Sequence, residues 1–128
     1  MWTLAELVQE YMDKDRPAGV ILDDEQVMQQ LIAATRMYAS YGRLSVSEND
    51  TASFEEITVD TVINTSEWGV IRPLFMLYVE RETAIQLEAS RAMGVEVYGR
   101  SVSEIAGEIM QVEAELPHRA FMQPVLSL

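Results

Sequence analysis

The feature that most restricts the fold is one long run of helical periodicity, EWGVIRPLFMLYVERETAIQLEASRAMG. At about 100° per residue, its apolar side chains form one broad stripe: Val70, Ile71, Leu74, Leu77, Tyr78, Ile85, Ala89 and Ala92. The sequence therefore predicts a helix over about residues 67–93, capped by Thr65 or Ser66. Pro73 removes one hydrogen bond inside this helix, and because Gly69 lies four residues earlier, we expect a kink there and not a break.

Three shorter segments carry the start and stop signals of further helices. Each opens on a capping box, in which the first side chain and another three residues later bond backbone N–H groups. The pairs are Thr3 with Glu6, Asp23 with Gln26, and Ser101 with Glu104. The predicted ends are residues 14–19 (KDRPAG), Gly42 and Pro117, because glycine and proline interrupt helical periodicity.

The segments between and after these helices lack helical periodicity. Residues 43–53 are polar and predict an exposed loop, and the β-branched residues of 54–63 alternate as in a short strand or extended arm. The predicted fold is mainly α, with one four-helix domain over residues 1–116 that includes a loop and arm at 43–64. An extended C-terminal docking tail is expected at 117–128.

The charge balance argues against two classes of partner. Twenty-one acidic side chains and nine basic ones give a formal net charge of −12. Nucleic acid and anionic membrane surfaces both attract clustered lysine and arginine, so neither is an expected binding partner. The most apolar window, residues 70–79, is too short to cross a bilayer, and no basic stretch precedes an apolar core at the N-terminus. We expect a soluble protein that is not exported.

The sequence shows none of the common motifs of catalytic and metal sites. It has no cysteine and a single histidine, His118, and no nucleophile elbow, phosphate-binding loop or dinucleotide fingerprint occurs. A di-iron bundle would need a histidine on each of two helices. The acidic run at residues 23–25 fits a helix N-terminus without a metal. We therefore expect no enzyme, no cofactor and no metal ion.

Arg81 falls near the middle of the apolar stripe, with Glu88 beside it. Because an unpaired buried charge costs several kcal/mol, Arg81 either extends its head to solvent or forms an ion pair between helices or subunits. Phe75, Met76 and Val79 lie outside the stripe, so the first half of this helix is apolar nearly all round. Three short helices do not easily cover it, and we expect oligomerisation.

The tail offers further candidate contacts, because an apolar extended segment can dock into a partner's groove or sheet edge. The candidate side chains are Phe121, Met122, Val125, Leu126 and Leu128.

A nearly repeated phrase occurs twice, YGRLSVSE at 41–48 and YGRSVSE at 98–104. Only the second leads into an apolar helical period, so the two copies do not predict the same structure. Each places an arginine, Arg43 or Arg100, after a glycine turn that ends a helix. Lys14 is the only lysine among the nine basic residues, and arginine is favoured where its planar fork pairs with carboxylates at interfaces. We interpret both arginines as subunit contacts; codon bias in a GC-rich genome is the other explanation for the arginine excess.

Two segments carry a resemblance to a known family. LDDEQVMQQLIAATRMYASYG and TSEWGVIRPLFMLYVERETA, in this order after a short first helix, resemble the small helical head–tail adaptor (connector or head-completion) proteins of tailed phages. The resemblance covers about residues 3–93 and rests on helix order and apolar spacing. The longer middle loop and the YGRSVSE-plus-helix extension depart from the smallest members of that family.

The resemblance implies a structural protein of the virion neck, made in the host cytoplasm. Its copies would form a homo-oligomeric ring, of about twelve subunits, between the portal protein and a neck, stopper or tail protein. The ring would extend the DNA channel and let DNA pass without sequence-specific binding. An acidic channel wall suits this role, because it repels phosphate.

Two other functions stay open at this point. An acidic helical binding or inhibitor module would act on a protein partner and would spread its carboxylates over one exposed face of a monomer or dimer. A small enzyme that uses glutamate and arginine side chains would show a concave pocket with perturbed carboxylates.

Overall fold

The computed structural model of the protein describes residues 1–17, 19–41, 57–91 and 100–126, with side chains described as far as Ala89 in the third segment and His118 in the fourth. Its elements are β1 (Trp2–Thr3), α1 (Leu4–Glu10), the π-helix η1 (Tyr11–Asp15), α2 (Asp24–Tyr41), β2 (Val62–Ile63), α3 (Thr65–Arg91) and α4 (Val102–Leu126). The prediction of a mainly helical fold with four helices is confirmed.

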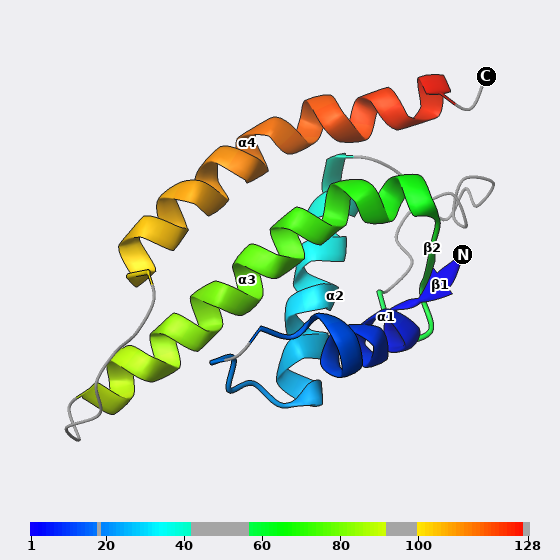
Figure 1. Cartoon of the computed structure of the whole chain (residues 1–128). Coiled ribbons are helices and arrows are strands. Elements are labelled where there is room, and N and C mark those ends of the chain that lie inside the picture. The colour runs from blue at the N-terminus through cyan, green and yellow to red at the C-terminus, as the bar shows by residue number, and fades with distance from the viewer. Residues whose placement is uncertain (18, 42–56, 92–99, 127–128) are drawn as a thin grey trace.

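The long helix α3 is the element on which the others are arranged (Figure 1). Both α2 and α4 pack against α3, and α1 packs on α2. Helix α4 runs back along α3 in the opposite direction, so the end of α3 lies beside the start of α4 (Figure 1). This arrangement leaves one side of the first half of α3 facing α1 and η1.

The capping boxes predicted for α1 and α2 are confirmed. At α1 the Glu6 N–H donates to the Thr3 hydroxyl at 3.2 Å, and the Thr3 N–H donates to the Glu6 carboxylate at 3.4 Å. At α2 the Gln26 N–H donates to the Asp23 carboxylate at 2.8 Å, and the Asp23 N–H donates to the Gln26 side-chain oxygen at 3.1 Å. These bonds satisfy N–H groups that have no partner inside the helices.

The long helix begins on a different residue from the one predicted. Asn64 and Glu67 form the cap, each accepting the other's backbone N–H at 2.8 Å, so the prediction of Thr65 or Ser66 as the cap is wrong. An asparagine just before the helix serves as well as serine or threonine, because its side-chain oxygen reaches the same N–H. From there α3 continues through Pro73 without a break, as predicted, and the expected kink at this residue stays a prediction.

A two-stranded antiparallel pairing joins the N-terminus to the segment before α3, with Trp2 opposite Ile63. Of the described residues of the predicted arm, 57–63, the last two form β2 of this sheet. The Thr61 N–H donates to the Thr58 carbonyl at 3.1 Å, and this turn interrupts the predicted alternation. The loop predicted at 43–53 lies outside the described residues.

The first half of α3 is covered by its own chain. Ile71, Leu74, Phe75 and Val79 are all at most 2% exposed, although they point in several directions around the helix. Helices α2 and α4 cover two sides, and Tyr11 of η1 packs against Phe75 on a third. Its own chain therefore buries Phe75 and Val79 and leaves Met76 partly exposed, and oligomerisation stays a prediction.

Helix α4 extends beyond its predicted end. Residues 117–126 continue the helix, so the prediction of an extended tail is wrong for this segment. Pro117 cannot donate to the Glu113 carbonyl, but it lies on the exposed side of α4, where water can bond that carbonyl. The preceding residue, Leu116, is fully buried and holds this part of the helix against the core.

Candidate functional site

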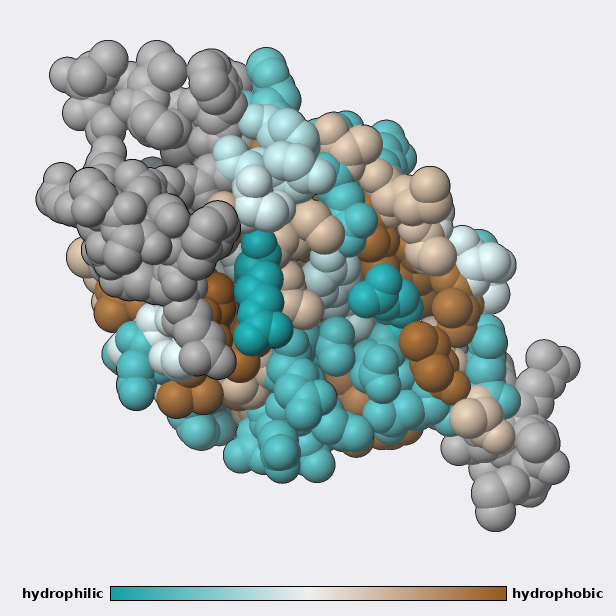
Figure 2. Space-filling view, turned by 180° about the vertical axis from the view of Figure 1, so that it is seen from behind, coloured by the Kyte–Doolittle hydropathy of each residue, from teal (hydrophilic) through white to brown (hydrophobic). Residues whose placement is uncertain are grey.

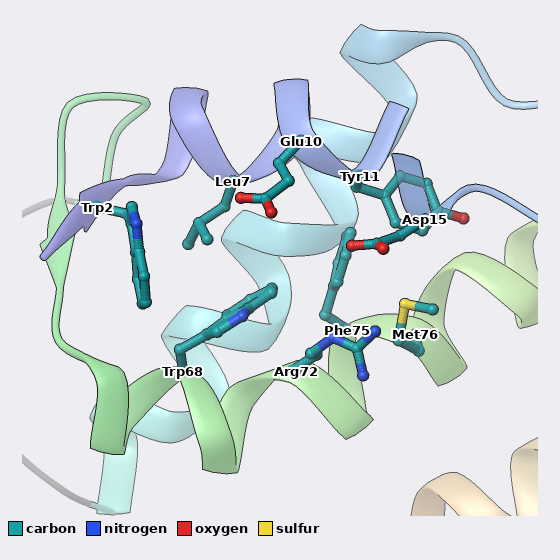
Figure 3. A pocket seen from close by; sticks show the side chains of 9 residues that line it. All are labelled: Trp2, Leu7, Glu10, Tyr11, Asp15, Trp68, Arg72, Phe75 and Met76. Carbon is teal, nitrogen blue, oxygen red and sulfur yellow. The ribbon is translucent and has the colours of Figure 1, made fainter. Parts of the chain in front are cut away.

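An open pocket lies between α1 and η1 on one side and the first half of α3 on the other (Figure 3). Aromatic and apolar side chains line it: Trp2, Leu7, Tyr11, Trp68, Phe75 and Met76. Three exposed charged side chains complete the lining: Glu10, Asp15 and Arg72. The volume is about 240 Å³, below the roughly 300 Å³ at which pockets for drug-sized ligands begin. The hollow therefore has about the size of a single side chain.

Phe75 organises the aromatic lining. It is 1% exposed, and its ring centroid lies 5.2 Å from that of Tyr11 in an edge-on contact and 5.9 Å from that of Trp68 in a tilted one. Such contacts favour defined ring orientations, so both neighbours are held in place. Trp68 and Trp2 are only partly buried and leave ring surface open to a ligand.

The backbone is irregular where it forms one wall of the pocket. Over η1 the chain leaves α-helical geometry, and the Arg16 N–H donates to the Tyr11 carbonyl, five residues back, at 2.8 Å. Single π-helical turns are rare in proteins, and many of those that do occur lie at functional sites. The first and last residues of this turn, Tyr11 and Asp15, both line the pocket.

The charged rim carries an excess of one negative charge. The Glu10 and Asp15 carboxylates come from α1 and η1, whereas the Arg72 guanidinium comes from α3 on the other side (Figure 3). Within the described residues, none of the three forms an ion pair. Burial raises the pKa of the Tyr11 hydroxyl, while Arg16 lowers it and Asp15 raises it by smaller amounts.

This pocket was not predicted, although the sequence contains a signal for one of its walls. Trp68, Arg72, Phe75 and Met76 follow the spacing i, i+4, i+7, i+8 and therefore share one face of a helix, outside the main apolar stripe. Nothing in this local spacing indicates that Trp2 lies beside that face; the pairing of β1 with β2 brings it there.

Arg81, predicted to form an ion pair or to extend to solvent, packs on an aromatic ring. Its guanidinium carbon lies 4.8 Å from the centre of the Tyr78 ring, and the side chain is partly buried. Within the described residues it forms no ion pair. The ring contact stabilises the cation at the edge of the core. An ion pair with another subunit stays a prediction.

Arg100, predicted as a subunit contact, joins α3 to α4. Its guanidinium forms ion pairs with Glu80 of α3 and Glu108 of α4, and its Nε donates to Glu80 at 3.2 Å. The hydrogen bonds to Glu80 and, to a smaller extent, to Glu108 raise the pKa of Arg100. The carboxylates that it meets here belong to its own chain, and its contact with a neighbour stays a prediction.

Glu88, also predicted as a contact, belongs to α3 and lies beside the start of α4. Its carboxylate accepts the Val102 N–H at 3.2 Å. The predicted cap of the same helix is present, with the Glu104 N–H donating to the Ser101 hydroxyl at 3.3 Å. The N-terminus of α4 is thus held by its own cap and by a carboxylate from α3.

The other predicted contact residues have no described side chains. Arg43 and Leu128 lie outside the described residues. Four more belong to α4, of which only the backbone is described at these positions: Phe121, Met122, Val125 and Leu126.

In the described parts of the chain, no group of three or more acidic or histidine side chains is arranged to hold a metal ion. No helix in those same segments has the length and apolar character needed to cross a membrane. No protein-family model, curated protein or solved structure matches the chain.

Proposed function

We propose that this protein is a structural subunit that acts by binding other proteins, as a phage head–tail adaptor in a ring between the portal and the neck. The two segments that carry the resemblance to that family form α2 and the first part of α3, which pack against each other. The role is architectural and extends the DNA channel, without a catalytic step.

The open aromatic pocket is the observation that carries a protein-binding function. Tryptophan, tyrosine and arginine are the side chains that most often dominate protein–protein binding energy, above all where a pocket receives an anchor from the partner. Here two tryptophans and Tyr11 surround a hollow of side-chain size, with charges of both signs at the rim. Charges of this kind fix the orientation of a bound partner.

Exposed apolar side chains on the two longest helices give further support. Met110 on α4 is 71% exposed and Ile85 on α3 is 42% exposed. On the face seen in Figure 2, hydrophobic side chains lie in separate areas between polar ones. Areas of this kind suit several modest contacts with neighbours better than one continuous obligate interface.

The net charge of −12 fits a subunit that lines a DNA channel. A wall with this charge repels phosphate, so DNA slides past without adhering.

The second candidate is an acidic helical module that binds a protein partner as a monomer. The cover of α3 by its own chain favours this candidate, because the fold completes its core without a neighbour. Both candidates use protein contacts, and they differ in self-assembly and in the partner.

Native mass spectrometry at micromolar protein concentration, with and without portal rings from the same virus, tests the adaptor role. We expect a ring in solution or on the portal. A Met110→Gln variant should weaken assembly if this face meets a neighbour, and Ile21→Gln, at a 52% exposed side chain outside the four helices, serves as the control.

A protein that stays monomeric and also fails to join portal rings would overturn the adaptor role. The same monomer, if it bound another protein with defined stoichiometry, would support the acidic binding module.

A further inference from the structure

The pocket between α1, η1 and α3 offers ring surface and negative charge to one ligand. Two partly buried tryptophans line it, and the Glu10 and Asp15 carboxylates stand on the α1 side (Figure 3). Neither carboxylate has an ion-pair partner within the described residues. Ring faces and free carboxylates in the same hollow are complementary to a cation with a flat or apolar body.

An arginine side chain fits this combination better than a lysine. Its planar guanidinium stacks on aromatic faces and donates to carboxylates in a fixed fork, and it gives up hydration more readily than an ammonium group. Tryptophan provides the strongest cation–π face among the aromatic residues. The protein already contains such a contact, where Arg81 lies 4.8 Å from the centre of the Tyr78 ring.

Arg72 opposes such a ligand and thereby supplies a test of its charge. It reaches the rim from α3, on the side opposite to Glu10 and Asp15 (Figure 3). A bound cation would lie toward the α1 side, attracted by the two carboxylates and repelled by Arg72. Loss of either carboxylate must therefore weaken binding of a cation, whereas loss of the Arg72 charge must strengthen it. A purely apolar anchor would not produce this difference.

We propose that this pocket binds an arginine side chain presented by a protein partner. The assignment of that arginine to a protein rests on the proposed function, whereas the preference of the pocket for a guanidinium group does not. The net charge of −12 adds attraction at long range.

The chain contains only two tryptophans, and both line the pocket, so intrinsic tryptophan fluorescence reports on this site alone. The experiment titrates the full-length protein with N-acetyl-argininamide, and compares N-acetyl-citrullinamide, a neutral analogue of similar shape, and N-acetyl-leucinamide. We expect the arginine compound to bind tightest and to lose affinity as salt is added.

Charge variants then test the direction of each contribution. Glu10→Gln and Asp15→Asn should each weaken binding of the arginine compound by about two- to fivefold, the scale of an exposed ion pair. Arg72→Gln should tighten binding by a similar factor. Glu25→Gln removes one exposed carboxylate from the start of α2, outside the pocket, and should leave binding unchanged.

Three results would overturn the proposal: no binding of the arginine compound, equal binding of the citrulline or leucine compound, or charge variants that all act in the same direction. Failure of the adaptor role is a separate result. A protein that binds the arginine compound but never joins portal rings retains the pocket assignment and loses the adaptor function.

Discussion

The Tyr78 hydroxyl on α3 donates a hydrogen bond of 2.5 Å to the Glu113 carboxylate on α4. Tyr78 is 4% exposed, so this bond lies at the inner side of the contact between the two helices. On the outer side, Arg100 pairs with Glu80 and Glu108 in side chains that are 41–45% exposed. The two contacts differ in burial, and their contributions to stability should differ accordingly.

Replacing Tyr78 with phenylalanine should lower the free energy of unfolding by about 1–2 kcal/mol, because a charge-assisted hydrogen bond is lost while the ring stays. Urea unfolding followed by circular dichroism measures the change. Tyr41→Phe, at a side chain that is 49% exposed, is the matched control and should have almost no effect. Equal losses in the two variants would contradict a stabilising role for the bond to Glu113.

Stability should fall in strongly alkaline solution as buried tyrosines ionise. Burial, and to a smaller degree Glu67, raises the pKa of Tyr38 from 10.0 to about 12. Because the folded state holds this proton more tightly than the unfolded chain, the stabilisation is complete below pH 10.0 and is lost as the pH approaches 12. Urea unfolding at successive pH values measures the fall. The Tyr38→Phe variant should lose stability less steeply over this range, and an unchanged slope would assign the loss to other groups.

Replacing Arg100 with glutamine should cost less than about 1 kcal/mol, because its ion pairs are exposed and screened by salt. Thermal unfolding at low and high salt measures the effect, and the difference from the wild type should shrink at high salt. Arg36→Gln is the control for loss of one positive charge, because Arg36 is exposed on α2 and forms no ion pair within the described residues. A large loss that salt does not change would show that Arg100 acts through packing.

Replacing Pro117 with alanine should stabilise the protein by about 1–3 kcal/mol, because alanine restores the bond to the Glu113 carbonyl. The helical circular dichroism signal should change little, because α4 already continues through this residue. Pro17→Ala is the control, since Pro17 lies in the loop before α2 and not inside a helix. Its carbonyl accepts the Val20 N–H at 3.3 Å. A marked increase in the helical signal of the Pro117 variant would show that α4 of the natural protein ends near this residue in solution.

The sequence could predict how most helices begin, because a capping box lies within four neighbouring residues. The pairs Thr3 with Glu6 and Asp23 with Gln26 act as predicted. The cap of α3 was missed by one or two positions, because Asn64 competes with Thr65 and Ser66 for the same role.

The end of α4 was predicted wrongly because proline is only a local signal. Its effect depends on whether the freed carbonyl faces water, and Pro117 lies on the exposed side of the helix beside the buried Leu116. The cover of α3 by its own chain was underestimated for a related reason. Counting apolar faces on one helix does not show how completely η1, α2 and α4 enclose it.

Local sequence determined the helices of this protein, since caps, periodicity and breakers act over a few residues of chain. Only the tertiary structure decided what Trp2, Tyr11 and Trp68 do together. The pairing of β1 with β2 carries Trp2 to the start of α3, and the packing of Tyr11 against Phe75 sets the opposite wall. This pocket forms only where distant parts of the chain meet. Which parts meet depends on the burial of apolar surface in the whole core, and a local segment does not determine it.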